Sequence, residues 1–144
     1  MKDMKNAIFG LIASVREHYR TFLHSELKSR GLSGIQTAHG SILGCLYSHE
    51  GQMLVLDIAR VLGRSKSSIS ELVDRLSDLG YVDKVRSDDD RRLINVVLTK
   101  KGHAIKKDFD EISTLLINKV YCGFSEQEKD ALVNGLLKMR NNLS

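Results

Sequence analysis

A serine-rich segment with two cationic side chains, Gly-Arg-Ser-Lys-Ser-Ser-Ile-Ser, spans residues 63–70. An amphipathic pattern follows, so these hydroxyls lie at the start of a predicted helix. Short polar side chains let a helix approach base edges in the major groove, and the positive end of a helix favours phosphate. Alternatively the serines only cap the helix, which is the role we expect for Ser65, although four hydroxyls exceed what one cap needs. The candidate DNA contacts are Arg64, Ser65, Lys66, Ser67, Ser68, Ser70 and Arg75, of which the arginines flank the segment and suit phosphates.

A second cluster of charges, Arg-Ser-Asp-Asp-Asp-Arg-Arg, occupies residues 86–92 between two segments of alternating hydrophobicity. Alternation on both sides predicts a β-hairpin with a charged tip. Arg91 and Arg92 on such a tip can enter a minor groove, where negative potential favours arginine. The aspartates would repel phosphate if they faced it, so we expect them to orient the arginines or to face solvent. A solvated, charged turn without function is the alternative.

The net charge of +4 is concentrated in one part of the chain. Residues 52–107 contain 12 Lys and Arg against 8 Asp and Glu, an excess of 4, whereas the remainder of the chain has 10 against 10. A local basic excess suits a polyanionic partner such as nucleic acid, although a chance cluster on a solvated face would look the same.

Length and composition favour a single, mainly helical domain of 144 residues. The hydrophobic content of 42% suffices for a core, and the lack of proline fits a helical chain. We find no apolar run of 18 residues and no signal-peptide pattern, which predicts a cytoplasmic protein without membrane association. Cys45 and Cys122 are far apart and have no CxxC partner, so we expect reduced thiols.

Hydrophobic periodicity and caps predict the order of the helices. A long amphipathic helix covers residues 4–30 and stops at Gly31, and a capping box at Ser33-x-x-Gln36 opens a second helix. A short helix follows at residues 55–62. Gly63 then turns the chain into a helix that Ser65 caps and Gly80 ends. Two helices of these lengths joined by a short turn are typical of a helix-turn-helix.

The pattern then changes to a period of two. Strands are predicted at residues 81–85 and 93–98, on either side of the charged tip. Thr99 caps one further long helix, which carries Ile105 and Phe109 on its apolar face. A second capping box, Ser125-Glu-Gln-Glu128, opens the last helix.

Several motifs, in this order, resemble the MarR family of winged helix-turn-helix regulators over nearly the whole chain. They are Leu62-Gly-Arg-Ser-Lys-Ser-Ser-Ile-Ser70, Leu72-Val-Asp-Arg-Leu76, Leu79-Gly-Tyr-Val82, Asp90-Arg-Arg92 and Leu98-Thr-x-x-Gly102. One departure concerns the first helix of the helix-turn-helix, which usually opens with Ser or Thr in this family. Here the sequence is Met53-Leu-Val-Leu, which leaves the start of that helix without an evident cap, and Gln52 is a poor substitute.

The resemblance implies a mainly α fold with a β-hairpin wing and one domain over residues 1–144. Within it, residues 33–102 form the winged helix-turn-helix, and residues 1–32 and 103–144 form the dimerisation helices. It also implies that Asp90 holds Arg92 while the arginine enters the groove. A homodimer would place two recognition helices about one DNA turn, roughly 10 base pairs, apart on a pseudo-palindromic operator. Alternatively, the outer helices complete a monomeric core.

Regulators of this family often respond to phenolic ligands, thiol oxidation or metals. Tyr19, His39 and Tyr47 are the candidate pocket residues, although aromatic side chains on such helices are more often core. Neither cysteine has an evident cationic activator, and the five histidines include no i, i+4 ligand pair, so we expect neither a redox switch nor a metal site. No cofactor is expected.

Enzyme motifs such as GxSxG, HExxH and GxxxxGK[ST] are absent from the sequence, which predicts a non-enzymatic protein. We therefore expect a homodimeric repressor that binds double-stranded DNA and is relieved by a small-molecule effector. The alternative is a winged-helix protein-interaction module without sequence-specific DNA binding. The polar groups at Lys66, Ser67, Ser68, Ser70 and Arg92 favour the former, because a surface that no longer binds DNA should lose them. The operator, the regulated genes and the identity of the effector do not follow from the sequence.

Overall fold

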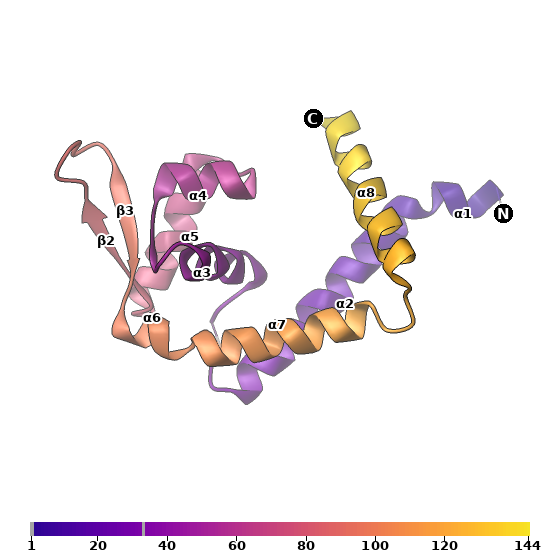
Figure 1. Ribbon diagram of the computed structural model, residues 1–144, viewed down its shortest axis with the longest axis horizontal. Helices are drawn as coiled ribbons and strands as arrows, with labels where there is room; N and C mark the ends of the chain where they lie inside the picture. Colours follow the sequence, from indigo (N-terminus) through magenta and orange to yellow (C-terminus); the bar gives the residue numbers. More distant parts are fainter. Residues whose placement is uncertain (1, 33) are drawn as a thin grey trace. The chain divides into compact units, whose positions relative to one another are not determined.

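The computed structural model describes residues 2–32 and 34–144, which form helices and one small sheet (Figure 1). The helices are α1 (Lys2–Asn6), α2 (Ile8–Ser29), α3 (Thr37–Ser48), α4 (Val55–Leu62), α5 (Lys66–Asp78), α6 (Lys100–Ala104), α7 (Lys106–Val120) and α8 (Glu126–Leu143). The strands are β1 (Gln52–Leu54), β2 (Val82–Arg86) and β3 (Ile94–Leu98). The chain divides into two compact units, one ending at Asp110 and the other covering residues 111–144.

The sheet is antiparallel with the strand order β1-β3-β2. The predicted hairpin is confirmed: Val82 pairs with Leu98 and Arg86 with Ile94. Strand β1 was not predicted, because a run of three residues is too short to display a period of two. It pairs with β3 through Met53 and Val96.

Strand β1 also accounts for the start of α4, which has no capping side chain. The N-cap residue Leu54 makes no side-chain cap hydrogen bond. It belongs instead to β1, where pairing with Asn95 holds the backbone extended up to the first residue of the helix. The Asn95 amide donates a further hydrogen bond of 2.9 Å to the side-chain oxygen of Gln52. The ladder therefore sets the position at which α4 begins.

The core of the first unit lies between α3, α4, α5 and the sheet. Its completely buried side chains are Ile42, Leu43, Leu46, Ile58, Ile69, Val73, Leu76, Val82 and Val96. Most of these residues are the apolar positions that helical periodicity predicts to face inward. In α5 the buried stripe consists of Ile69, Val73 and Leu76, which leaves the opposite face of that helix in solvent.

The start of α3 differs from the prediction. Ser33 lies outside the described residues, but the helix begins only at Thr37, so the predicted opening over residues 33–36 is wrong. Gly34 has a φ of +97°, which is incompatible with a right-handed helix at that position. The imidazole Nδ1 of His39 accepts a 2.9 Å hydrogen bond from the backbone N–H of Gln36. Histidine thus takes the part that Glu or Gln has in the usual capping box.

Two predicted helices are interrupted. The first is divided at Ala7 into α1 and α2. The helix after Thr99 is divided at Ile105. The φ of −86° and ψ of 0° at this residue depart from regular helix geometry and separate α6 from α7. Periodicity misses such a break, because the apolar spacing continues across it. The cap at Thr99 is confirmed, since its hydroxyl accepts a hydrogen bond of 3.1 Å from the N–H of Gly102.

The second unit contains α8, whose predicted capping box is confirmed. The Ser125 hydroxyl accepts from the Glu128 N–H at 3.1 Å, and the Glu128 carboxylate accepts from the Ser125 N–H at 3.1 Å. No residue of α8 is buried. The exposed apolar side chains of this helix are Leu132, Val133, Leu136, Leu137 and Leu143. Among the described residues, no helix is both long and apolar enough to cross a membrane.

Candidate nucleic-acid interface

Gly63 in the left-handed conformation ends α4, and the Ser65 cap begins α5 two residues later. Gly63 ends α4 with a φ of 64°, and the next N–H, that of Arg64, bonds to the carbonyl of Ala59 at 3.0 Å. The Ser65 hydroxyl then accepts from the Ser68 N–H at 3.1 Å. The predicted cap at Ser65 is confirmed, and one lone pair of its hydroxyl is engaged within the protein.

The candidate contacts from Arg64 to Ser70 lie together on the first turns of α5. Arg64, Lys66 and Ser67 are exposed, while Ser68 and Ser70 are half-buried beside the buried Ile69. These side chains therefore occupy the solvent side of the helix start, where four backbone N–H groups of a helix have no intrahelical partner. Their position is suited to a groove or to a phosphate.

Arg75 is separate from this cluster. It lies in the last turn of α5, about 14 Å along the axis from Lys66 at 1.5 Å per residue. Its guanidinium Nη2 is 3.4 Å from the point that a Cβ on Gly34 would occupy. Burial, and then the charge of Arg75, lower the pKa of His39. The structure thus places Arg75 beside the start of α3.

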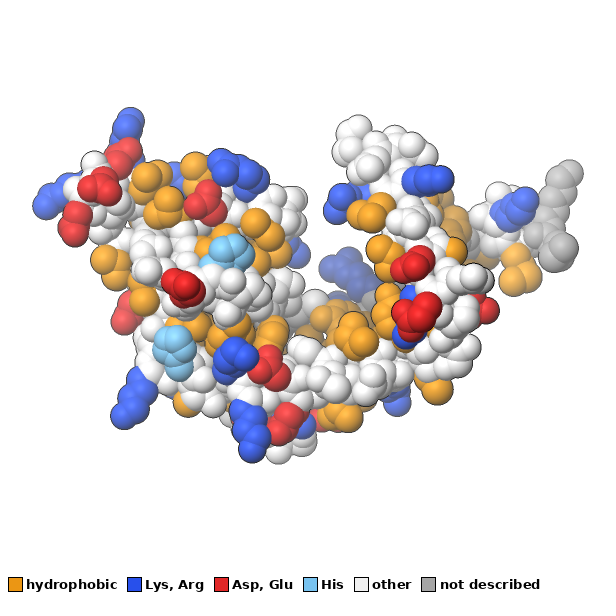
Figure 2. Space-filling view, in the orientation of Figure 1, with side chains coloured by type: hydrophobic (Ala, Val, Ile, Leu, Met, Phe, Trp, Pro, Cys, Tyr) orange, Lys and Arg blue, Asp and Glu red, His pale blue; other side chains and the backbone are white. Residues whose placement is uncertain are grey.

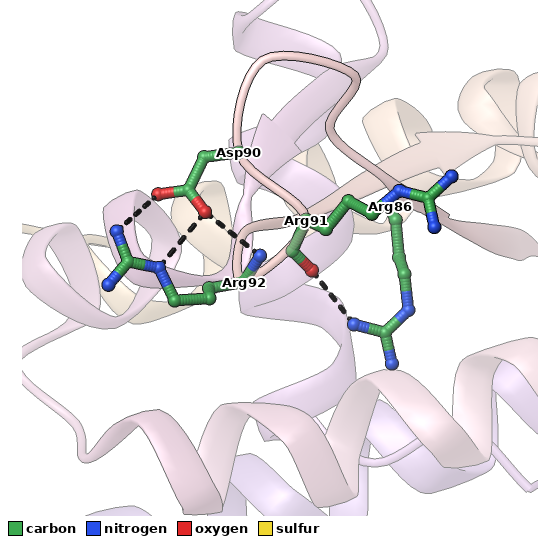
Figure 3. Close-up of polar contacts among 4 residues, drawn as sticks. All are labelled: Arg86, Asp90, Arg91 and Arg92. Atoms are coloured by element: carbon green, nitrogen blue, oxygen red, sulfur yellow. Dashed lines mark hydrogen bonds and ion pairs between the residues drawn. The ribbon is translucent and has the colours of Figure 1, made fainter.

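The charged tip of the hairpin is organised around Asp90 (Figure 3). The Asp90 carboxylate accepts three hydrogen bonds from Arg92: 3.0 Å from the backbone N–H, 3.1 Å from Nε and 3.0 Å from Nη2. The side-chain and then the backbone hydrogen bonds from Arg92 lower the pKa of this carboxyl. The guanidinium is held in one orientation although 90% of the Arg92 side chain is exposed.

Arg86 braces the same loop from its other end. Its Nη1 donates a 2.8 Å hydrogen bond to the backbone carbonyl of Arg91, while the Arg91 side chain points away from Asp90 (Figure 3). The Ser87 N–H also bonds to the Leu93 carbonyl at 2.9 Å. Asp88 and Asp89 are exposed. At the upper left of Figure 2 the tip presents both acidic and basic side chains.

An ion pair connects the hairpin to α5. Lys84 on β2 donates a hydrogen bond to the carboxylate of Asp74 on the solvent side of α5. Neither residue was singled out from the sequence. Lys84 is an ordinary outward position of an alternating strand, and only the tertiary structure brings it to α5.

The candidate pocket residues have separate surroundings. The Tyr47 hydroxyl donates to the Gly102 carbonyl at 2.7 Å, and its ring centre is 5.2 Å from that of Phe109. Burial first, then the charge of Asp110 and the neighbouring Tyr81, raise the pKa of Tyr47 to about 12.

At the other end of α3, burial raises the pKa of Tyr19, which a hydrogen bond with the Thr37 side chain partly offsets. His39 is buried and faces Gln36 and Arg75. Eight residues, about 12 Å of helix, separate His39 from Tyr47. The contacts of the three side chains therefore do not converge on one point.

Comparison with known proteins matches residues 33–93 to the model of the MarR family. The match includes the helix-turn-helix and strand β2, so this part of the chain is similar to the MarR family. Its relatives include YfiV of Bacillus subtilis, an uncharacterized HTH-type transcriptional regulator that is 34% identical over 91 residues. That match covers 63% of this chain and 57% of the length of YfiV.

Solved structures establish the winged-helix fold of this chain. The organohalide-sensing regulator RdhR, crystallised with 2,4-dichlorophenol, has a TM-score of 0.84 at 23% identity and covers 96% of this chain and 80% of its own. Staphylococcus aureus MepR in a complex with DNA has a TM-score of 0.78 at 24% identity, with coverage of 93% and 94%. The predicted fold class is confirmed. The matched relative YfiV is described as a transcriptional regulator, which agrees with the prediction of a non-enzymatic protein.

Proposed function

We propose that this protein is a MarR-like, sequence-specific DNA-binding repressor that acts as a homodimer on a pseudo-palindromic operator. The observation that carries the proposal is the pairing of Asp90 with Arg92, which orients an almost fully exposed cation on the wing. A solvated turn without function has no need of three hydrogen bonds to one carboxylate. A cation held in a fixed orientation is suited to a narrow minor groove.

The recognition helix contributes the base contacts. Lys66, Ser67, Ser68 and Ser70 lie on the turns of α5 that a helix-turn-helix inserts into the major groove. Lys66 and Ser67 are exposed and can reach base edges or phosphates, whereas the hydroxyl of Ser65 is already used as a cap. Arg64 precedes these turns and Arg75 lies in the last turn of α5, and both suit the phosphate backbone.

A second copy of the chain would cover the outer helices. None of the residues of α8 is buried, yet the helix carries apolar side chains at i, i+4 spacing, such as Leu132 with Leu136. Exposed apolar side chains also lie on α2, including Phe9, Leu11 and Val15. Figure 2 shows hydrophobic side chains on the visible face of α8. Large apolar patches of this kind mark interaction surfaces, and two-fold pairing would present two recognition helices to successive DNA turns.

An effector of phenolic chemistry would act on the geometry of that dimer. Tyr19 lies on α2, and His39 and Tyr47 lie on α3, so the candidate residues come from two helices. A ligand that favours one distance between the two DNA-binding regions of the dimer would change the affinity for DNA. The reason is that the duplex fixes the distance between the two half-sites. The dichlorophenol complex of RdhR motivates the choice of chlorinated and hydroxylated phenols as the first probes.

Fluorescence anisotropy on duplexes selected from a random pool, across a salt series, tests the proposal. We expect nanomolar-range, salt-sensitive binding to a two-fold site, and binding weakened roughly tenfold or more by Arg92→Ala. Arg20→Ala on α2 removes the same charge at an exposed i, i+3 pair with Glu17 and should change the affinity little. Equal binding to selected and random duplexes would favour the protein-interaction module instead.

The oligomeric state is tested separately by sedimentation velocity. Leu132→Glu combined with Leu136→Glu should raise the dimer dissociation constant by at least an order of magnitude, because two charges would be buried without partners. Lys138→Glu on the same helix is the charge control. A monomeric wild-type protein would contradict the proposed dimer.

A further inference from the structure

Three consecutive backbone carbonyls directly after α5 accept hydrogen bonds from two residues at the start of α6. Lys101 Nζ donates to the carbonyl of Leu79 at 2.7 Å. The Thr99 hydroxyl donates to the carbonyl of Gly80 at 2.6 Å, and the Thr99 N–H donates to that of Tyr81 at 3.1 Å. We call this set of contacts, from Thr99 and Lys101 to residues 79–81, the helix clasp.

The clasp contacts the C-terminal end of α5, where the last carbonyls of a helix lack intrahelical partners. Leu79 is the C-cap residue of α5. A cation at this position also interacts favourably with the negative end of the helix dipole. The ammonium of Lys101 lies 4.7 Å from the centre of the Tyr81 ring, which adds a cation–π contact. Lys101 therefore has three reasons to remain at this end of α5.

The clasp also requires the backbone at Gly102 to approach the backbone at Tyr81 closely. A Cβ on Gly102 would lie 2.1 Å from the Tyr81 carbonyl oxygen, so only glycine fits. The Gly102 carbonyl in turn accepts the 2.7 Å hydrogen bond from the hydroxyl of Tyr47 on α3. The end of α5 is thus connected through α6 to α3.

The clasp also lies at the base of the wing. Strand β2 begins at Val82, immediately after the clasped carbonyls, and β3 ends at Leu98, immediately before Thr99. Val82 and Leu98 are paired in the ladder. A change in the clasp would therefore alter the angle between α5 and the wing, which must enter two grooves at the same time.

We propose that Lys101 is a positioning residue for DNA reading: through the clasp it sets the orientation of α5 relative to the wing without itself touching DNA. This inference rests on the proposed DNA-binding function. Its competitor is a direct phosphate contact by the same lysine. The two differ in salt dependence, because each phosphate-contacting cation contributes about one to the slope of log K against log salt concentration.

The decisive experiment measures DNA affinity and salt slope for the full chain carrying Lys101→Met. We expect affinity for the selected duplex to fall roughly threefold to tenfold, as for loss of one charge-assisted hydrogen bond, while the salt slope stays that of the wild type. Lys101→Arg keeps a donor and should restore most of the affinity. Lys100→Met removes the neighbouring exposed charge outside the clasp and should leave affinity within about twofold. Lys66→Met should lower the slope by about one.

Amide hydrogen exchange supplies a readout that does not depend on DNA. In Lys101→Met the N–H groups of Gly80 and Tyr81, which bond to Ser77 and Leu76 at the end of α5, should exchange faster than in Lys100→Met. Faster exchange together with weaker binding at an unchanged slope supports the positioning role. A reduced slope, an unchanged affinity or unchanged exchange would each overturn it. If the wild-type protein selects no duplex, the proposed function itself fails, which is distinguishable from failure of Lys101→Met alone.

Discussion

Asp90 and Arg92 form a two-point contact in which both the Nε and the Nη2 of the arginine donate to one carboxylate, at 3.1 and 3.0 Å. The pair lies on an exposed loop, where an ordinary ion pair contributes little to stability. Its effect is on orientation, since the bidentate geometry restricts a side chain that would otherwise sample many rotamers.

The first prediction concerns the sign of an Asp90 substitution. Asp90→Asn removes a negative charge from the surface that is proposed to face DNA, which by charge alone should tighten binding. We expect instead about threefold to tenfold weaker binding, because Arg92 loses its orientation. Anisotropy titrations measure the effect, and Asp89→Asn on the same loop is the matched control, which should bind equally or more tightly. Tighter binding by Asp90→Asn would refute the orienting role.

The second prediction separates a cap from a contact on α5. Ser65→Ala should lower the free energy of unfolding by about 1 kcal/mol, because the Ser68 N–H loses its acceptor. Ser67→Ala should change stability by less than about 0.5 kcal/mol and weaken DNA binding instead. Urea denaturation and anisotropy on the two variants would give the reverse ranking if Ser67 were the structural residue.

The third prediction concerns the close approach at Gly102. Gly102→Ala should reduce the free energy of unfolding by about 1–3 kcal/mol, because the new methyl group would overlap the Tyr81 carbonyl and force the clasp apart. Gly135→Ala in α8 meets no atom within 4 Å and should stabilise the chain by about 0.5–1 kcal/mol. Urea denaturation measures both. A neutral Gly102→Ala would mean that α6 can shift freely.

The fourth prediction is a pH dependence through His39. Burial, and then the charge of Arg75, lower the pKa of His39 in the folded protein, so the unfolded chain binds the proton more readily. The contribution of this group to stability is complete above its unfolded pKa of about 6.5 and decreases as pH falls from there towards the folded value. Protonation would also remove the Nδ1 acceptor for the Gln36 N–H.

His39→Gln keeps an acceptor at this position of the capping box but does not titrate. The variant should therefore lose less stability than the wild type between pH 7.5 and pH 5.5, as measured by urea denaturation. The exposed His18→Gln is the control and should follow the wild type. Parallel pH profiles for wild type and His39→Gln would exclude His39 as the source of the dependence.

Local signals in the sequence were sufficient for most of the elements. The caps at Ser65, Thr99 and Ser125 and the alternation on both sides of the charged tip depend on residues within a few positions of one another. Neighbours in sequence are neighbours in space on a helix or in a hairpin, so these predictions needed no knowledge of the fold. The contact between Asp90 and Arg92 was implied by the family resemblance, and it is local as well, because the two residues are two positions apart.

Contacts between distant residues were decided only by the tertiary structure. Strand β1 forms because Met53 pairs with Val96. Helix α3 starts at Thr37 because the chain turns at Gly34 and the His39 imidazole accepts a hydrogen bond from the Gln36 N–H. Lys84 reaches Asp74, and Lys101 reaches the end of α5, only after the hairpin has folded back. Residue types and local spacing were enough to single out the groups that are proposed to read DNA. Packing determined how these groups are held relative to one another. Nothing in the sequence around Lys84 on β2 indicates that it will contact Asp74 on α5.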